Sequence, residues 1–524
     1  MKGTILLWAL LALTVSGYER LQGPTELLFC DKEKAFPGYT LFGVGNRTWL
    51  LDLDGRVVHT WPVGTNPHLL DNGHIVDASK DDPSGFQGFK EVDWDGKTVW
   101  EYTEKRGNYA PHHDWVRIFN KKLDAPTTLY IANKSVTGEQ AQAAGADRDG
   151  EMDAVVEVDM QGKVVWEWWF FDHVVQDADP AKPHFVGAGK KIADYPGRIN
   201  LNMPGKPLKR DWLHCNSVDY NAKSGHIVIN SVQGELYVID HDGTFVAGDP
   251  QAGIAKAAGA AGEFLYRFGD PARYGQGEAP RVLENWDSAT SGHKQMGGTH
   301  DASWIPQGLP GAGNLMVFNN GQYLYQRTPG SSVLEINPFL DAAGNDTGEY
   351  VNPPVVGYRR ESYDKDTHNQ PRLVSRQIVW SYRSTNSHGF FSHIGSSGQR
   401  LPNGNTFICS DTEGHFFEVT AKSELAWEYI NPVTRDGPVK VLGDVLPMTN
   451  SAFRAYRYAA DHPAFKGRDL TPHGTITERA AQGLDTYPKR RPPGEDPQGK
   501  GTGQRGRRSS GGGGHDGLPQ PVGP

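Results

Sequence analysis

Four histidines open similar short strand patterns, and imidazole is a side chain that can do chemistry from such a position. The clearest pattern lies at residues 298–304, where a strand begins near His300 and is followed by an apolar strand that ends at Asn320. The other histidines that open comparable units are His113, His214 and His393. Imidazole can act as a nucleophile, as a general acid or base, or as a metal ligand. Histidines that hold one position in successive repeats converge in space, so we expect a shared site.

Repeated hairpins supply the elements that would carry these histidines. Two alternating strands around an Asp-Gly or Gln-Gly turn, a pattern typical of a β-hairpin, occur at residues 50–61, 91–102, 157–168 and 238–246, with less regular copies within 333–382 and at 417–429. Another strand pair precedes most of these hairpins. Four strands per unit in six units predict an all-β fold, a six-bladed β-propeller. The units exceed the usual repeat length of about 40–50 residues, so long loops are expected to cap one face.

The innermost strand of each propeller blade lines the central channel. The four histidines are therefore predicted to face one axial pocket, together with the side chain of Asn216. His112 competes with its neighbour His113 for this position, and each histidine could instead be bonded within the sheet. The tryptophans of the hairpins are expected to pack between blades; they are Trp61, Trp100, Trp166, Trp380 and Trp427.

Composition divides the chain into four segments. Residues 1–17 join a basic start to an apolar run and small residues, which predicts a secretory signal peptide, with an uncleaved anchor as the alternative. Residues 18–39 are a lead-in, and residues 40–470 form the propeller with a C-terminal packing segment that includes a short helix at 450–460. Residues 471–524 are a low-complexity tail that is predicted to be disordered. We expect a secreted or periplasmic protein with no membrane span after signal cleavage.

The charge of the chain bears on its partners, and its cysteine content bears on disulfide bonding. The formal net charge of −9 is spread over 524 residues, and the basic cluster lies in the low-complexity tail, so a nucleic-acid partner is not expected. Three cysteines do not make a disulfide scaffold, and their odd number leaves at least one thiol unpaired within the chain. The oligomeric state stays open.

The blades from about residue 111 to residue 432 resemble the arylsulfotransferase family of six-bladed propellers. The resemblance rests on residues 211–220, on the strand at 227–231, and on residues 299–304 with 317–321. Members of this family are secreted bacterial enzymes that move a sulfuryl group from one phenolic ester to another phenol without an adenylyl phosphosulfate carrier. The resemblance implies a small-molecule aryl sulfate and a phenol as substrates, and it implies no cofactor.

The same resemblance assigns roles to individual residues. His300 would be the nucleophile that becomes a transient sulfohistidine, while His214, Asn216 and His113 would hold the sulfuryl oxygens and protonate the leaving phenolate. Such a reaction needs in-line attack on sulfur, donors around the equatorial oxygens and a proton for the leaving group. The predicted substrate-binding residues are His393 and Asn320.

One position departs from the family pattern. Family members carry an arginine at the end of the strand that follows the His-x-Asn motif, and this chain has Val232 there. A guanidinium is the preferred bidentate partner of an anionic oxygen group. Lys294 or Arg454 could replace that charge, but the sequence places neither residue in the channel.

Two functions of other classes remain open. Several imidazoles around one axis could bind Zn²⁺ or Cu²⁺, which would make the protein a metal-dependent hydrolase or a metal-binding module. No carboxylate or thiolate in the sequence completes a recognised ligand spacing for such a site, so we predict no metal ligands. A secreted propeller without catalytic activity could also bind a partner through its long loops.

Overall fold

A computed structural model describes the residues on which the fold and the site depend. The described ranges are 24–79, 87–144, 149–203, 208–279, 292–321, 330–352, 357–365, 371–384, 389–443, 449–485 and 487. The chain divides into two compact units, Met1–Thr486 and Tyr487–Pro524. All elements named below belong to the first unit. The predicted signal peptide and the part of the predicted tail after residue 487 lie outside the described residues.

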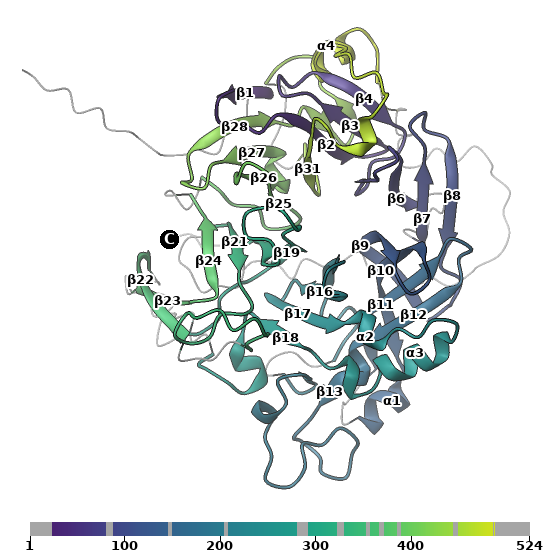
Figure 1. Cartoon of the computed structure of the whole chain (residues 1–524), viewed down its shortest axis with the longest axis vertical. Helices are drawn as coiled ribbons and strands as arrows, with labels where there is room; N and C mark the ends of the chain where they lie inside the picture. Colours follow the sequence, from purple (N-terminus) through teal and green to yellow (C-terminus); the bar gives the residue numbers. More distant parts are fainter. Residues whose placement is uncertain are drawn as a thin grey trace, which may run out of the picture. The chain divides into compact units, whose positions relative to one another are not determined.

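Six antiparallel sheets of the first unit stand in a ring around one axis (Figure 1), which confirms the predicted six-bladed β-propeller. Blade 1 contains β31 (Ala455–Ala459), β2 (Gly38–Val44), β3 (Arg47–Leu51) and β4 (Val57–Trp61). Blade 2 contains β5 (His68–Leu69), β6 (Ile75–Ser79), β7 (Gly88–Val92) and β8 (Thr98–Thr103). Blade 3 contains β9 (Tyr109–Asn120), β10 (Ala125–Val136), β11 (Gly150–Asp159) and β12 (Val164–Trp169).

The other three blades follow in chain order. Blade 4 contains β15 (Cys215–Asn221), β16 (His226–Ser231), β17 (Glu235–Asp240) and β18 (Tyr266–Phe268). Blade 5 contains β19 (Thr299–Trp304), β20 (Leu315–Asn319), β21 (Ser332–Ile336) and β24 (Ile378–Tyr382). Blade 6 contains β25 (Ser397–Arg400), β26 (Thr406–Ser410), β27 (His415–Val419), β28 (Leu425–Ile430) and β1 (Glu26–Cys30). In each blade the strand named first is the innermost.

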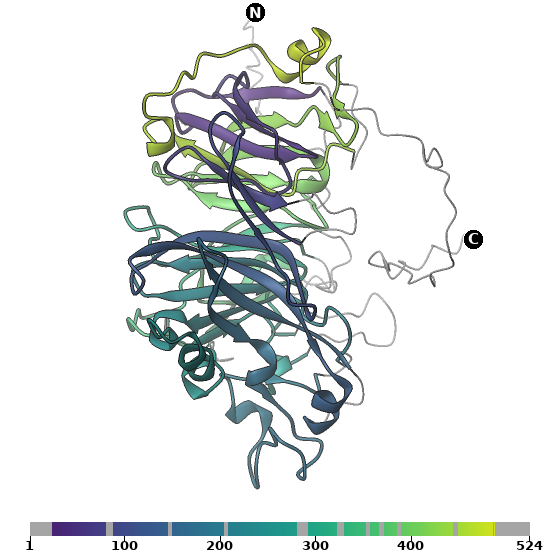
Figure 2. The ribbon, with the colours of Figure 1, turned by 90° about the vertical axis from the view of Figure 1, so that its right-hand side faces the viewer.

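Both ends of the propeller chain contribute to its closure. β31 pairs with β2, so the C-terminal inner strand completes the sheet of the N-terminal strands, and β1 pairs with β28 in blade 6. Figure 2 shows the yellow C-terminal segment beside the purple N-terminal strands. The lead-in at 18–39 therefore contains β1 and the start of β2. The predicted helix at 450–460 is wrong, because Ala455–Ala459 forms strand β31. Its aromatic residues, Tyr456 and Tyr458, alternate with smaller and basic residues in the period of two that is typical of a strand.

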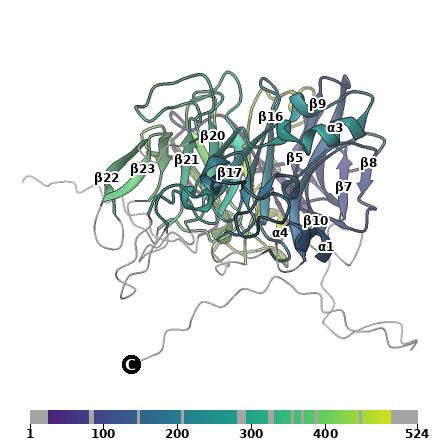
Figure 3. The same cartoon turned by 90° about the horizontal axis from the view of Figure 1, so that it is seen from below.

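Short helices and small sheets lie outside the blades. The helices are α1 (Gly138–Ala143), α2 (His241–Thr244), α3 (Pro250–Ala257) and α4 (Ile476–Ala481), and Figure 3 shows α3 towards one face and α1 towards the other. The two-stranded sheets pair β13 (Val174–Val175) with β14 (Ile199–Asn200), β22 (Tyr358–Lys365) with β23 (Pro371–Ser375), and β29 (Val433–Thr434) with β30 (Gly437–Pro438). Within the described part of the chain, no helix is long and apolar enough to cross a membrane.

Two segments outside the blades differ from the sequence predictions. The hairpin expected at 238–246 does not form: β17 ends at Asp240, whose side chain accepts a hydrogen bond from the Gly243 amide over 2.6 Å and so begins α2. The outer strand of that blade comes only after α3. Residues 471–485 were expected in a disordered tail, but they include α4, which begins with a capping box between Thr475 and Glu478.

The blades are held together by buried sheet faces and by the tryptophans of the hairpins. All residues of β20 and β26 are buried, because each central strand packs against a neighbouring blade on both faces. Each of four indole nitrogens donates a hydrogen bond to the next blade or its connecting loop: Trp100 to Met160, Trp166 to Thr244, Trp380 to Ala421 and Trp427 to Leu53. The expectation that these tryptophans pack between blades is confirmed for these four positions.

Candidate active site

Hydrogen bonds between neighbouring inner strands reveal which residues are equivalent. In four of the six inner strands, a side chain at one position accepts a hydrogen bond from a backbone N–H of the next blade. These bonds, over 2.8–3.4 Å, are accepted by Asp114 from Val218, by Ser217 from Ala302, by Asp301 from Gly398 and by Ser397 from Ala455. The donor follows its own blade's position by one residue each time, so Arg454 holds this position in blade 1. The residues one step earlier form a second equivalent set: His113, Asn216, His300, Ser396 and Phe453.

This register separates the four predicted histidines. His113 and His300 occupy the same position in blades 3 and 5, as expected. In blade 4 that position is held by Asn216, and His214 lies two residues earlier; in blade 6 it is held by Ser396, and His393 lies three residues earlier. The expectation that all four histidines hold one place therefore applies to only two of them.

Bulges interrupt the inner strands of blades 3, 4 and 5 at this position. In β9, residues 112–114 stand opposite Ile131 alone; in β15, Asn216 is the extra residue; and in β19, residues 301–302 stand opposite Val317 alone. A bulge adds a residue to one strand and turns its side chains to a new direction. The backbone is left-handed at His113 (φ 57°) and at Asp301 (φ 52°), a conformation that costs a non-glycine residue free energy.

His300 is a buried, neutral imidazole whose tautomer is fixed by Asn320. The amide nitrogen of Asn320 donates to the carbonyl oxygen of Ser392 over 2.8 Å, so its Oδ1 faces His300 Nδ1 at 2.7 Å. Because an amide oxygen only accepts, Nδ1 carries the proton and Nε2 carries the lone pair. Burial lowers the pKa of His300 to about 4, and the positive charge of Arg454 adds to this effect. Only 3% of His300 is exposed.

His113 lies in a chain of imidazoles. Its Nδ1 is 2.8 Å from Nδ1 of His112, and Nε2 of His112 is 2.9 Å from Asp153 Oδ1. Burial lowers the pKa of His113 well below its usual value, and the neighbouring His112, His214 and His300 act in the same direction. Both adjoining histidines thus contribute: His113 holds the channel position, and His112 connects it to a buried carboxylate.

His214 differs from the other two because it is paired with a carboxylate. Its ring centroid is 4.6 Å from that of His113, and its Nδ1 lies 2.5 Å from Asp211 Oδ2. Burial disfavours the imidazolium, but the hydrogen bond to Asp211 outweighs burial and raises the pKa of His214. Burial also opposes ionisation of Asp211, yet the bond with His214 lowers the pKa of Asp211 to about 2. With 34% of its side chain exposed, His214 is an accessible imidazole of this site, and its partner Asp211 favours its charged form.

Asp211 was not among the predicted site residues, although it begins the same sequence motif as His214. Its left-handed backbone (φ 53°) and its hydrogen bond from Asn133 (3.2 Å) hold it beside the imidazole. The spacing of Asp211, three residues before His214, was therefore the sequence signal that could have identified it as a site residue. Asp153 offered no such signal, because it comes from β11 and reaches His112 only through the fold.

Asn216 is completely buried and bonded within the protein. Its Oδ1 accepts from Asn230 over 2.5 Å, and its Nδ2 donates to the carbonyl oxygen of Thr299 over 2.8 Å. The Asn216 side chain thus connects blade 4 to the residue directly before His300. Val232, at the position of the family's arginine, donates its backbone N–H to the carbonyl oxygen of His214 over 3.1 Å.

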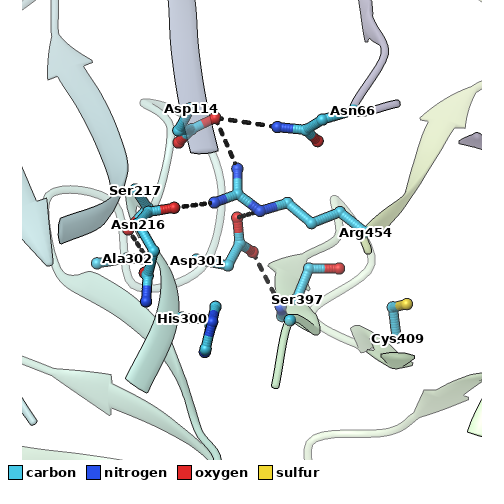
Figure 4. A network of polar contacts seen from close by, with 12 residues as sticks. Asn66, Asp114, Asn216, Ser217, His300, Asp301, Ala302, Ser397, Cys409 and Arg454 are labelled. Atoms are coloured by element: carbon cyan, nitrogen blue, oxygen red, sulfur yellow. Dashed lines mark hydrogen bonds and ion pairs between the residues drawn. The ribbon is translucent and has the colours of Figure 1, made fainter. Parts of the chain in front are cut away.

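The two alternative cations lie in different places. Burial raises the pKa of Asp270, and the charge of Lys294 opposes that rise, so Lys294 lies near Asp270 in the connection between blades 4 and 5. Arg454 instead lies at the centre of the inner-strand network (Figure 4), where it is 96% buried and contacts Asp114, the Asn216 carbonyl oxygen and Asp301.

Aromatic rings lie at the same level as the histidines. Phe453 is half-buried, and its ring centroid is 6.2 Å from that of His113 and 6.3 Å from that of His300. The guanidinium carbon of Arg454 lies 5.1 Å from the Phe453 ring. His393 is half-buried, and its ring centroid lies 6.5 Å from that of Phe391.

Among the described residues, no group of three or more His, Cys, Asp or Glu side chains is arranged to hold a metal ion. One ring nitrogen of each of three histidines lies against a protein group: Nε2 of His112 against Asp153, Nδ1 of His214 against Asp211, and Nδ1 of His300 against Asn320.

Comparison with known proteins gives a family match. A family model described as Arylsulfotransferase (ASST) matches residues 43–439. No curated protein matches the chain. Among solved structures, the chain is similar to a protein of unknown function from Bacteroides caccae (11% identity, 80% of this chain and 98% of that chain, TM-score 0.37) and to apo AztD from Citrobacter koseri (10%, 81% and 99%, TM-score 0.32). It is also similar to the WD40 domain of Toxoplasma gondii coronin (9%, 89% and 94%, TM-score 0.32).

Proposed function

Because the chain belongs to the arylsulfotransferase family, we propose that it transfers a sulfuryl group from an aryl sulfate to a phenol through a covalent intermediate on His300. The single observation that carries this proposal is the hydrogen bond of 2.7 Å between His300 Nδ1 and Asn320 Oδ1. It leaves the lone pair on Nε2, and a pKa of about 4 keeps the ring unprotonated at neutral pH. A neutral imidazole nitrogen with a fixed lone pair is a suitable nucleophile.

The first half-reaction transfers the sulfuryl group to the protein. His300 Nε2 attacks sulfur in line, a nitrogen–sulfur bond forms, and the bond between sulfur and the aryl oxygen breaks. The leaving phenolate takes a proton from His214, which Asp211 keeps as an imidazolium. In the second half-reaction, neutral His214 accepts the proton of the acceptor phenol, whose oxygen attacks sulfur. The nitrogen–sulfur bond breaks and both histidines return to their starting states.

His214 can also supply the positive charge that the family's arginine would provide at the position of Val232. The imidazolium of His214 lies next to His113 at the open side of the cluster, so it can place positive charge near the sulfuryl oxygens. Arg454 is less suited to that contact, because its guanidinium is already paired with Asp114 and Asp301. Neutral His113 is a further donor or acceptor for the same group.

The sequence also bears on the location of the protein and on the class of its substrates. We propose that no nucleotide carrier takes part, that no metal is required, and that residues 1–17 direct the protein out of the cytoplasm to a secreted or periplasmic location. The substrates are then small phenolic compounds available outside the cell. The half-buried ring of Phe453 beside His113 and His300 is an apolar surface against which an aryl group can pack.

Intact-mass analysis tests the covalent step. The metal-stripped protein is exposed briefly to p-nitrophenyl sulfate, with His300→Ala as the matched variant. We expect one added sulfuryl group and release of p-nitrophenolate for the wild type, and neither for the variant. A folded wild type that gives no adduct and no phenolate contradicts the proposal; stoichiometric zinc or copper in that protein as purified would then favour the metal-binding alternative.

A further inference from the structure

We propose that Arg454 is a positioning residue of this site: its guanidinium holds the three bulged segments that present His113, Asn216 and His300. The inference rests on the proposed function, because it assigns a role within the same site. Arg454 lies after the end of the family match at residue 439, on the segment that leads into β31.

Arg454 makes one contact with each of the three bulged inner strands (Figure 4). Its Nη1 donates to Asp114 Oδ1 over 2.9 Å, and its Nη2 donates to the carbonyl oxygen of Asn216 over 2.8 Å. Its Nε lies 3.4 Å from Asp301 Oδ1. Asp114 and Asp301 directly follow the two channel histidines, and Asn216 is itself the bulged residue of its strand. Each contact is therefore made where a strand departs from regular pairing.

The bulges create groups that need such a partner. A bulged residue leaves a backbone group outside the strand ladder, and a buried carbonyl oxygen without a hydrogen bond is costly. The side chains of Asp114 and Asp301 are only 3% and 4% exposed, and buried carboxylates persist only when they are paired. One planar cation contacts all three groups, which a lysine ammonium could not do with the same geometry.

The register supports a specialised role for this residue. In four other blades the equivalent positions are occupied by Asp114, Ser217, Asp301 and Ser397, which accept a backbone N–H from the next blade. Arg454 differs, because it donates hydrogen bonds across the axis to blades 3 and 4 and forms an ion pair with Asp301 of blade 5. Among the described pairs of an inner strand with its neighbour, register shifts occur in those same three blades, while β5–β6, β25–β26 and β31–β2 pair without one.

Arg454 affects the histidines through its positive charge as well as through the contacts that it makes. Burial is the main cause of the lowered pKa of His300 and of His113, and the positive charge of Arg454 lowers both further. His214 faces both rings, and His112 also faces His113. Asp114 and Asp301 face the guanidinium, so its removal would leave two carboxylates beside the imidazoles.

The test separates charge from geometry with two variants and a matched control. Arg454→Lys keeps the charge and loses the three-way contact, whereas Arg454→Gln loses both. Arg457 provides the control, because it is a buried arginine three residues later, in β31, and it contacts Thr40, Phe36 and Glu418 instead of the site. The readouts are the pH midpoint of His300, measured by deuterium exchange at its Cε1–H with peptide mass spectrometry, and kcat and KM with p-nitrophenyl sulfate and a phenol.

We expect Arg454→Gln to raise the His300 midpoint by on the order of one pH unit and to lower kcat by roughly 10- to 100-fold. Arg454→Lys should keep the midpoint near that of the wild type and still lose kcat, with a smaller change in KM. Arg457→Gln and Arg457→Lys should lose stability and leave the midpoint and kcat of the folded fraction unchanged.

Equal behaviour of the Arg454 and Arg457 variants would overturn the inference, because Arg454 would then support only the fold. If Arg454→Gln does not fold, the two lysine variants decide: a loss of kcat in Arg454→Lys alone supports the inference, and equal kcat overturns it. If the wild type transfers no sulfuryl group, the proposed function fails, and the midpoint of His300 in Arg454→Gln still tests the role of the arginine: a rise supports it and no change overturns it.

Discussion

At the scale of single residues, the cluster contains imidazoles in different protonation states. Burial holds His300 and His113 neutral, while the pairing with Asp211 favours the imidazolium of His214. An imidazole must be neutral to attack sulfur, and it must be an imidazolium to give a proton to the leaving phenolate. The same residue type is thus prepared for opposite roles by a difference in partner: an amide oxygen for His300 and a carboxylate for His214.

The pairing of His214 can be tested by Asp211→Asn. Asparagine tolerates the left-handed backbone at this position and keeps an acceptor, so the change removes mainly the negative charge. We expect the pKa of His214 to fall by on the order of one unit, and the alkaline limb of the kcat/KM profile to move to lower pH by the same amount.

Asp124→Asn is the matched control for that change. Asp124 also has a left-handed backbone (φ 51°), and it is exposed at a turn of blade 3, away from the histidines. Its replacement should leave the profile in place. An unchanged alkaline limb in Asp211→Asn would show that His214 does not supply the proton.

At the scale of elements, local sequence and tertiary context compete at two segments. β31 and α2 were expected as a helix and as a hairpin. In β31 the alternation of Ala455, Tyr456, Arg457 and Tyr458 fits a strand that needs the edge of β2 as its partner. In α2 the Asp-Gly pair follows His241, which is drawn into a buried contact with Glu157, so the chain turns away from the sheet.

The contacts between blades make a prediction for Trp427. This side chain is completely buried, and its indole donates to the carbonyl oxygen of Leu53 in blade 1 over 2.8 Å. Trp427→Phe removes the donor and leaves that oxygen unsatisfied, which should lower the free energy of unfolding by about 1–3 kcal/mol. Urea denaturation measures the loss.

The half-exposed Trp100 gives the comparison for Trp427. Its indole donates to the Met160 carbonyl oxygen over 2.9 Å, but solvent can replace the lost partner at this position. Trp100→Phe should therefore cost less than Trp427→Phe. Equal losses would mean that the hydrogen bond to blade 1 does not set the cost.

At the scale of the whole propeller, stability depends on contacts that join one blade to the next. His241, only 1% exposed, places Nε2 2.8 Å from Glu157 in blade 3 and Nδ1 2.8 Å from Asp242 in blade 4. Burial opposes the charged ring, but the two hydrogen bonds outweigh burial and raise the pKa of His241. The buried imidazolium therefore joins two blades through ion pairs.

This arrangement predicts how stability changes with pH. A pKa that is raised on folding stabilises the protein fully below the unfolded value of about 6.5, and the stabilisation is lost as the pH rises through the folded value. His241→Gln should lower the free energy of unfolding by roughly 3 kcal/mol at pH 6 and by less at pH 9, measured by urea denaturation at both pH values.

His226→Gln is the control for the pH effect. Burial lowers the pKa of His226, and its Nδ1 is 2.7 Å from the Tyr350 hydroxyl. Among the residues that the structure describes, His226 forms no ion pair. Its replacement should not become less costly as the pH rises. A cost of His241→Gln that is the same at both pH values would contradict the buried imidazolium.

The sequence by itself determined the architecture and the types of residue at the site. Turn residues and alternating strands repeat along the chain, and such local patterns follow from backbone sterics and from burial of one side of each strand. The family motif likewise marked His113, His214, Asn216 and His300. These features needed no knowledge of distant contacts.

Only the tertiary structure decided the register of the site. One extra residue in a strand reverses which side chains face the channel, and the bulges in β9, β15 and β19 cannot be recognised from alternation alone. They persist because Arg454, 340 residues after Asp114 in the chain, brings its charge to the centre of the inner strands. Its place there depends on β31 closing the ring against β2, a contact between the two ends of the propeller that no local pattern encodes.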